Sequence, residues 1–333
     1  MTKKDELMST LLKKAKKLGK KPTIVLTEGW DERGLKAAEY IVKENIAEMI
    51  LLGNEKDIKK AAEKSNVDIS KMKIINQKTS GLRDGLAEAL FRLREKKGMT
   101  KEKALELLND VNYFGCMLAH TGKADAVVGS LICPTAELMK PALQILKAGF
   151  VNEVFLLYDP THDRIIFATD ASLNIEPTEE ELADMGVNAG KTARLFGIEP
   201  KIGFLSFSTY GSGGADVPQV KKVKDAVKLA QEKAPDMQID GEFQFDAALN
   251  PDAAKRKCPD SKLGGKCNVV VFPNLNAANI FVHGMNQFCG ADFLFSMPRG
   301  MKKPVGILGR STPAETVKNM FVLAAVEAVE GTG

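Results

Sequence analysis

The sequence of 333 residues predicts an α/β protein with two domains, each a mostly parallel sheet between helices. Short apolar runs typical of buried strands alternate with segments whose apolar residues recur at helical spacing. Strands joined through helices lie parallel, with helices on both faces of the sheet, which gives three layers. A second series of strands begins near Phe150. We therefore expect one domain from residues 1–149 plus 303–333 and another from residues 150–302.

The first half of the chain alternates strand and helix almost throughout. Its apolar runs predict strands over Thr23–Thr27, Glu48–Leu52, Lys73–Ile75 and Ala124–Val128. Helical periodicity predicts helices over Asp31–Glu44, Lys56–Ser65, Gly81–Lys97, Lys101–Leu108, Tyr113–Thr121 and Thr135–Lys147.

The second half opens with a hairpin and then resumes the alternation. Strands are expected at Val154–Tyr158, Arg164–Thr169, Lys201–Ser208, Gln238–Phe243, Cys267–Phe272, Asp292–Phe295 and Pro304–Leu308. Helices are expected at Thr178–Phe196, from Pro218, at Phe245–Arg256, at Asn276–Gln287 and at Pro313–Glu330. The first of these helices has a capping-box pattern, Thr178 with Glu181 three residues later.

Composition excludes several classes of function. The net charge of +4 is modest, and the lysines alternate with glutamates, which is typical of solvated faces and not of a nucleic-acid track. No apolar run reaches the ~18 residues of a membrane helix, and the polar N-terminus is no signal peptide. The five cysteines form no CxxC pair, so we expect reduced thiols in a cytoplasmic protein and no metal site.

One loop has the layout of an anion site. The expected strand Lys201–Ser208 runs into a Gly- and Ser-rich turn, Thr209–Asp216, and a helix follows from Pro218. Such a layout directs backbone N–H groups and the positive end of a helix at one point, where a phosphate can bind. Neither the Walker A pattern nor the dinucleotide fingerprint is present. The loop therefore favours an anion site, with a plain strand–helix connection as the alternative.

Several motifs resemble the phosphate acetyltransferase (phosphotransacetylase) family. They cover essentially the whole chain in order: Glu28–Gly29, Asp31–Arg33, Leu93–Arg94, Tyr113–Gly115, Pro141–Ile145, Leu205–Thr209 with Gly211–Ser212, Asp240–Ala248, Asn268–Leu275 and Leu308 with Arg310. The resemblance implies an isocitrate dehydrogenase-like fold, with a cleft between the domains, a C-terminal helix that returns to the first domain, and usually a homodimer. It also implies acetyl transfer between coenzyme A (CoA) and inorganic phosphate, giving acetyl phosphate. CoA then acts as a substrate, and no metal or redox cofactor is needed.

The resemblance assigns roles to particular residues. Arg310 matches the family arginine that meets the phosphate or acyl phosphate, and an arginine fork suits that anion. Arg94 matches an arginine associated with CoA, and Lys140 stands where the family has a second one. The residues expected to bind phosphate or acyl phosphate are Ser208, Thr209, Gly211, Ser212 and Arg310.

Departures from the family pattern gather around the expected site. Gly309 stands where the family has a serine that assists at the carbonyl, and Thr316 stands where it has an aspartate base. Ser311 and Glu315 are the neighbours that could replace them, so the expected catalytic residues are Arg310, Ser311 and Glu315. Phe281 and Phe295 are expected to alter the acyl site, and Tyr210 stands where the family has lysine. A phosphate propionyl- or butyryltransferase and a catalytically impaired paralogue that binds CoA or acyl phosphate remain open as alternatives.

Overall fold

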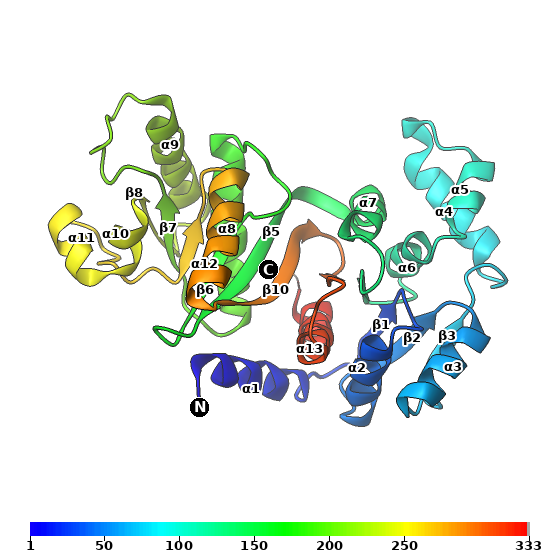
Figure 1. Cartoon of the computed structure of the whole chain (residues 1–333). Coiled ribbons are helices and arrows are strands. Elements are labelled where there is room, and N and C mark those ends of the chain that lie inside the picture. The colour runs from blue at the N-terminus through cyan, green and yellow to red at the C-terminus, as the bar shows by residue number, and fades with distance from the viewer. Residues whose placement is uncertain (332–333) are drawn as a thin grey trace. The chain divides into compact units, whose positions relative to one another are not determined.

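The computed structural model describes residues 1–331 of the chain, which fold into two compact units (Figure 1). The first unit contains Met8–Gly149 and a second segment that starts at Gly300, and the second unit contains Met1–Leu7 and Phe150–Arg299. The expected domain boundaries differ from these units in two short segments: residues 1–7 lie in the second unit, and residues 300–302 lie in the first. The N-terminus joins the second unit because the Lys3 N–H donates to Asp163 Oδ1 at 2.8 Å.

The first unit has a parallel sheet of five strands in the order β11-β4-β1-β2-β3. The strands are β1 (Thr23–Leu26), β2 (Glu48–Leu52), β3 (Lys73–Ile75), β4 (Ala126–Gly129) and β11 (Val305–Ile307). The helices are α2 (Glu32–Lys43), α3 (Glu55–Ser65), α4 (Arg83–Arg94), α5 (Lys101–Leu107), α6 (Val111–His120), α7 (Thr135–Ile145) and α13 (Ala314–Glu330), with a 3₁₀ turn at Glu95–Lys97. Helix α1 (Lys3–Ala15) has residues 8–15 in this unit and residues 3–7 in the second. Helix α1 was not predicted from the sequence.

Helices cover both faces of the first sheet because successive side chains of β1 point to opposite sides. Leu26 lies against Gly34 of α2, while the preceding residue Val25 lies against Gly115 of α6. A Cβ at Gly34 would approach the Leu26 side chain to 2.9 Å, so glycine permits this close packing. Helix α13 also packs against α2 and against β4. Because residues 320–327 are all buried, on every side of the helix, α13 is part of the core of the first unit.

The second unit has a six-stranded sheet in the order β10-β5-β6-β9-β7-β8. The strands are β5 (Lys147–Asp159), β6 (Arg164–Thr169), β7 (Lys201–Leu205), β8 (Gln238–Phe243), β9 (Val269–Val271) and β10 (Asp292–Met301). The helices are α8 (Glu179–Leu195), α9 (Pro218–Lys233), α10 (Phe245–Leu249), α11 (Pro251–Lys257) and α12 (Leu275–Cys289). The predicted hairpin is confirmed, because β5 and β6 pair antiparallel.

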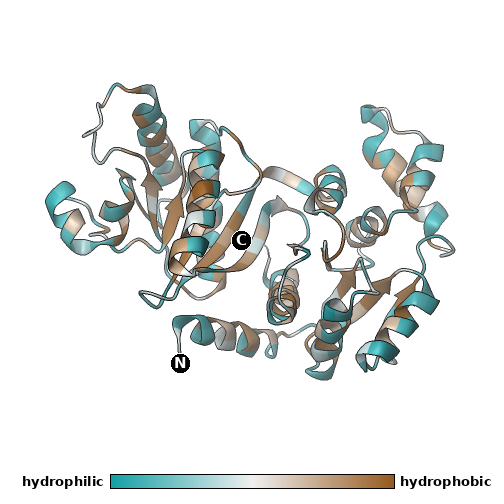
Figure 2. Cartoon of the chain, viewed as in Figure 1, coloured by the Kyte–Doolittle hydropathy of each residue, from teal (hydrophilic) through white to brown (hydrophobic). Residues whose placement is uncertain are grey.

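The second sheet is also the middle of three layers. Phe204 of β7 lies against Gly186 of α8, whereas the next residue, Leu205, joins a buried cluster with Ala247 of α10 and Ala278 of α12. Figure 2 shows the result as brown, apolar strands with teal, polar residues on the helices around them. The predicted α/β fold with two mostly parallel sheets is therefore confirmed.

Two predictions about single elements were wrong. The helix expected over Phe245–Arg256 is broken, because Asn250 is extended and Pro251, which has no N–H to donate, opens a new helix that Asn250 caps. The strand expected at Val154–Tyr158 begins earlier, at Lys147, where helix α7 has already ended. Among residues 1–331, no helix is long and apolar enough to span a membrane.

Candidate active site

The first sheet has a topological switch point between β1 and β4. The chain leaves β1 toward β2 and β3 on one side, and β4 and β11 occupy the other side. In open α/β sheets, ligands bind beyond the carboxyl ends of the strands at such a point. The residues that follow β1 are Thr27 and Glu28, and β4 and β11 are followed by Ser130 and Leu308. The residues beyond these strand ends therefore define the candidate active site of the first unit.

Glu28 fills the backbone donors of the loop after β4. Its carboxylate accepts hydrogen bonds from the N–H groups of residues 131, 132 and 133 at 2.5, 3.0 and 2.6 Å, and its side chain is buried. Burial, reinforced by the Glu28 carboxylate, raises the pKa of the nearby Cys133 thiol to about 11. This thiol therefore stays protonated at neutral pH and is a poor nucleophile.

Arg310 lies just beyond β11 with its guanidinium free. The side chain is exposed and, within residues 1–331, it has no hydrogen bond or ion pair. The loop that carries it is closed by the Gly309 N–H, which donates to Thr312 Oγ1 at 2.7 Å. An unpaired guanidinium on a fixed loop can form two parallel hydrogen bonds to a phosphate or an acyl phosphate.

The other two expected catalytic residues are on the same segment. Ser311 is exposed beside Arg310. Glu315 lies in the first turn of α13, where its carboxylate pairs with Lys318 at 2.7 Å and is 68% exposed. Thr316 is only half-buried, and its hydroxyl cannot act as a base at neutral pH.

Arg94 and Lys140 come from neighbouring helices of the first unit. Arg94 Nη1 makes a long contact of 3.5 Å with the Gln144 carbonyl, and its buried Nε has no hydrogen-bond partner. Gln144 and Lys140 are four residues apart on α7, so they share one face of that helix. Lys140 is exposed. The two residues expected to bind CoA therefore lie close to one another.

The predicted phosphate loop belongs to the second unit, and its donors have partners inside the protein. The carboxylate of buried Glu242 accepts from Ser208 Oγ at 2.8 Å and from the Gly211 N–H at 2.7 Å. The Thr209 N–H donates to Ser212 Oγ at 3.0 Å. Within this loop, the side chain of Ser212 is exposed, while Ser208 and Thr209 are buried.

The phenylalanines expected at the acyl site have packing roles. Phe295 is 1% exposed, and its ring centroid lies 6.0 Å from that of Phe196 in the core of the second unit. Phe281 packs between Phe245 and Phe272, with ring centroids 4.6 and 5.1 Å away. Phe295 is therefore a core residue of the second unit, and its effect on the acyl site stays a prediction.

Three charged residues were missed as contributors to these loops. Glu28, Arg33 and Glu242 were part of the family resemblance but had no role assigned. The available signal was position, because Glu28 follows one buried strand closely and Glu242 lies near the end of another. A charged residue at the carboxyl end of a buried strand needs hydrogen-bond partners in the adjoining loops.

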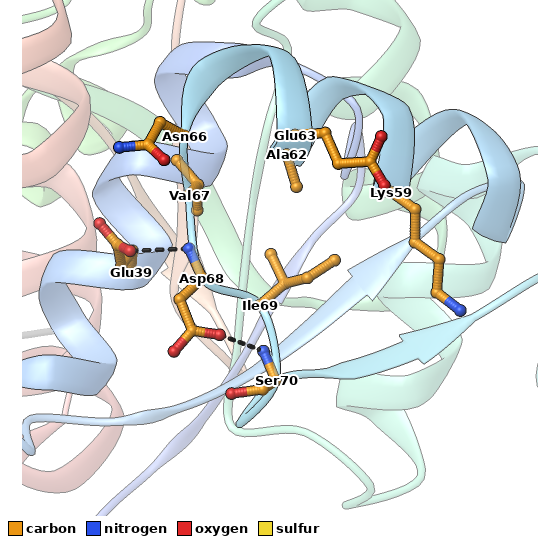
Figure 3. Close-up of a pocket in the computed structure, with 9 residues that line it drawn as sticks. All are labelled: Glu39, Lys59, Ala62, Glu63, Asn66, Val67, Asp68, Ile69 and Ser70. Atoms are coloured by element: carbon orange, nitrogen blue, oxygen red, sulfur yellow. Dashed lines mark hydrogen bonds between the residues drawn. The ribbon is translucent and has the colours of Figure 1, made fainter.

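A separate pocket of the first unit has the wrong charge for these substrates. It lies between α2, α3 and the loop that follows, and its lining includes Glu39, Lys59, Glu63 and Asp68 (Figure 3). Glu39 is held there by the Asp68 N–H, which donates to its carboxylate at 2.7 Å. Three carboxylates and one lysine disfavour a phosphate-bearing ligand.

Comparisons with known proteins identify the family. The model of the phosphate acetyl/butaryl transferase family matches residues 6–325. The chain is 41% identical over 332 residues to a phosphate acetyltransferase of Staphylococcus epidermidis, covering 98% of this chain and 99% of the relative. It is 39% identical to one of Thermoanaerobacterium thermosaccharolyticum, covering 97% and 99%.

Solved structures agree with this result. A phosphotransacetylase from Streptococcus pyogenes superposes with a TM-score of 0.93 at 38% identity, covering 99% of this chain and 100% of that one. A branched-chain phosphotransacylase from Enterococcus faecalis shares the fold, with a TM-score of 0.65 at 20% identity over 92% of this chain and 99% of that one. The chain belongs to the phosphate acetyl/butaryl transferase family and is an acyltransferase.

Proposed function

We propose that this protein transfers an acetyl group reversibly between acetyl-CoA and inorganic phosphate, giving acetyl phosphate and CoA. Relatives named phosphate acetyltransferase, 37–41% identical over nearly the whole chain, support the reaction. The observation that carries the proposal is the unpaired guanidinium of Arg310 beyond the carboxyl end of β11. Arginine at such a position binds an acyl phosphate through charge-assisted hydrogen bonds.

The chemistry is a direct exchange at the acyl carbon. The CoA sulfur attacks the carbonyl of acetyl phosphate, a carbon–sulfur bond forms, and the carbon–oxygen bond to phosphate breaks. Phosphate leaves with the electron pair, and the thiol proton passes to a base or to solvent. Arg310 stabilises the charge on the phosphoryl group, and Ser311 supplies a hydroxyl donor near the carbonyl oxygen. The reaction requires no metal or redox cofactor, and CoA is a substrate.

Glu315 is the candidate base for the thiol. Its carboxylate is exposed and lies at the positive end of α13, but it is paired with Lys318. Proton abstraction by Glu315 therefore requires that this ion pair open. Without a base, a thiol of pKa near ~8.5 is only a few per cent ionised at pH 7, which permits a slower reaction.

The remaining contacts are assigned by charge and by loop position. Arg94 and Lys140 bind the phosphates of CoA, and their proximity on α4 and α7 supports this pairing. In the second unit, the loop with Ser208, Thr209, Gly211 and Ser212 contributes polar contacts to the phosphate or acyl phosphate. Because Glu242 already occupies two of its donors, the exposed Ser212 hydroxyl is the group best placed for this role.

One assay of the purified protein tests which acyl group it prefers and whether it catalyses the transfer at all. CoA is supplied with acetyl, propionyl or butyryl phosphate, and thioester formation is measured. The proposal expects the highest kcat/KM with acetyl phosphate. A preference for propionyl or butyryl phosphate would identify the longer-chain alternative. Binding of CoA without turnover of any of the three would identify an impaired, ligand-binding paralogue.

A second copy of this chain is the proposed partner, and the cytoplasm, where five free thiols stay reduced, is the proposed location. Helix α12 buries only Ala278 and leaves apolar side chains uncovered. Ile280 is 72% exposed and Phe288 is 92% exposed, and Phe293 of β10 is 39% exposed. Large exposed apolar side chains on one helix and a nearby strand are typical of an association surface.

The first prediction concerns this surface. Phe288→Asp places a charge in the apolar face, so it should shift the molar mass measured by light scattering from two chains toward one. The exposed lysine Lys140 lies in the other unit, and the matched change Lys140→Asp should leave the molar mass unchanged. A wild-type mass of one chain, or an unchanged mass in Phe288→Asp, would contradict the assignment of this surface.

The second prediction concerns Arg310. Arg310→Gln removes the fork that binds phosphate, so it should raise the KM for phosphate and for acetyl phosphate and lower kcat by on the order of 10²–10³-fold. The melting temperature should stay near that of the wild type, because the side chain has no hydrogen-bond or ion-pair partner among residues 1–331. Steady-state kinetics with each substrate varied in turn measure this. Unchanged kinetics would remove Arg310 from the mechanism.

The third prediction concerns CoA. Arg94→Ala should raise the dissociation constant for CoA more than the KM for acetyl phosphate, because it removes a cation from the CoA site. Lys140→Arg should tighten CoA binding by up to about 1 kcal/mol, since a guanidinium forms two hydrogen bonds to a phosphate. Isothermal titration calorimetry measures both. The site lies elsewhere if neither variant changes the affinity for CoA.

The fourth prediction tests the two departures from the family pattern. Gly309→Ser and Thr316→Asp together should raise the acyl-transfer rate, with a larger gain than the sum of the single variants in activation free energy. A Cβ at Gly309 would meet only Thr312 Oγ1, at 3.4 Å, so the loop accommodates a side chain. Asp at 316 falls in the first turn of α13, where the helix dipole favours a carboxylate.

The pH dependence of the acyl-transfer rate shows whether the introduced aspartate supplies a missing base or duplicates a base that the protein already has. The double variant should gain most below pH 8, where little CoA is ionised. A flat rate in the double variant would contradict the prediction. A wild-type profile that already falls near pH 6 would show that another group, such as Glu315, acts as the base.

A further inference from the structure

Arg33 is a second arginine at the candidate active site, and all five of its N–H donors are used. Nε and Nη2 donate to the two carboxylate oxygens of Asp31 at 3.2 and 2.9 Å. The three remaining donors bind backbone carbonyls. Nη1 donates to Arg310 O at 2.7 Å and to Thr312 O at 3.1 Å, and Nη2 also donates to Leu131 O at 2.8 Å. A guanidinium has five donors, so Arg33 has none left for a ligand.

These bonds connect the loops that follow three strands. Asp31 lies beyond β1, Leu131 beyond β4, and Arg310 beyond β11. Asp31 is itself fixed, because its carboxylate accepts the N–H groups of residues 33 and 34 at the start of α2. A single side chain anchored on α2 therefore sets the separation of the loops around the switch point.

The charge of Arg33 is compensated, whereas that of Arg310 is not. Asp31 is 9% exposed and Arg33 is 27% exposed, so their ion pair is partly shielded from water. The described residues give the Arg310 guanidinium no carboxylate partner. The two arginines therefore have different roles. Arg33 makes all of its hydrogen bonds within the protein, whereas the guanidinium of Arg310 is available to bind an anion.

We propose that Arg33 is the positioning residue for Arg310, which it holds through the Arg310 carbonyl; this role rests on the proposed function. Without Arg33, the turn at 309–312 keeps the bond from the Gly309 N–H to Thr312 Oγ1 and the bond from the Thr312 N–H to the Gly309 carbonyl. Both bonds are internal to the turn. They preserve its shape but not its place relative to the loops after β1 and β4.

Loss of Arg33 should affect the binding of phosphate and the rate of acyl transfer, but not the binding of CoA. A displacement of about 1 Å in a reacting group can cost on the order of 10²-fold in rate. Arg33→Gln should therefore lower kcat by about 10–100-fold and raise the KM for acetyl phosphate. The KM for CoA should change little, because Arg94 and Lys140 make no hydrogen bond to this turn.

Arg83 provides the matched control in the same unit. Its guanidinium also donates to three carbonyls, those of Gln77 at 2.7 Å, Leu108 at 3.3 Å and Leu105 at 3.1 Å. None of these three carbonyls belongs to the turn at 309–312 that carries Arg310. Arg83→Gln should lower the melting temperature and leave kcat at saturating CoA near the wild-type value. If Arg83→Gln loses stability but keeps its kcat, a general loss of stability does not explain a lower kcat in Arg33→Gln.

The deciding experiment is a double-mutant cycle with Arg310. If Arg33 acts through Arg310, then Arg33→Gln should have little further effect on kcat/KM for acetyl phosphate in the Arg310→Gln protein. Arg33→Lys keeps the charge but not the five donors, so it should also lower kcat, and it serves as the test variant if Arg33→Gln does not fold. Full additivity in the cycle, or a wild-type kcat in the variants, would overturn the proposal.

A binding measurement separates this proposal from the proposed function. Calorimetric titration with inorganic phosphate needs no turnover, and Arg33→Gln should weaken phosphate binding by about 10-fold or more, as Arg310→Gln does. If the wild type binds phosphate but transfers no acetyl group, the proposed function fails and the positioning role stands on the titration. If the wild type transfers acetyl groups and Arg33→Gln binds phosphate normally, the positioning role fails alone.

Discussion

Buried carboxylates at the ends of strands fix the loops on which the candidate site depends. Removing a carboxylate from water costs several kcal/mol unless hydrogen bonds replace the water. Glu28 recovers this cost from three backbone N–H groups. Glu242 recovers part of it at Oε1, which accepts from a serine hydroxyl and one N–H, while its buried Oε2 has no hydrogen-bond partner among the described residues. In each unit, an internal anion therefore holds the kind of loop that binds phosphate in other α/β proteins. External anions must then be bound mainly by side-chain cations.

The cations divide into structural and available groups. Arg33 gives all of its donors to the protein and makes a neutral pair with Asp31. In the described part of the chain, Arg310 and Lys140 have exposed charges with no ion-pair partner, and Arg94 retains an unpartnered Nε. This division suits a site that binds two phosphate-bearing substrates, because a fixed loop holds Arg310 and the helices α4 and α7 hold Arg94 and Lys140 before either substrate arrives.

The sequence predicted most of the fold, because the strands are short apolar runs and the helices have regular spacing. Thr23–Leu26 and Val269–Val271 are nearly identical to the predicted strands or lie inside them. The break at Asn250 was missed even though Pro251 signals a helix start, because the apolar pattern continues across it. The first part of β5 was missed, because its exposed start at Lys147 is followed by Gly149 and by the buried polar residues Asn152 and Glu153, which interrupt the apolar run.

The candidate site was less predictable than the fold. Arg310, Arg94 and Lys140 were identified through the family resemblance, and spacing alone would not have selected them among 47 lysines and arginines. The loop at Ser208–Ser212 has the composition of a phosphate loop, but composition cannot show that a glutamate distant in sequence fills its donors. The role of Arg33 could not be predicted for the same reason. Its hydrogen-bond partners lie about 100 and 280 residues away in the sequence and come together only when the chain folds.

In the proposed reaction the acyl group passes directly between the thiol and phosphate, with no covalent acyl–enzyme intermediate. Exchange of labelled inorganic phosphate into unlabelled acetyl phosphate, measured with and without CoA, tests it most directly. Direct transfer requires CoA to accept the acetyl group and return it, so we expect rapid exchange with CoA and none without it. Exchange in the absence of CoA would contradict direct transfer, and no exchange in its presence would contradict the acetyltransferase activity itself.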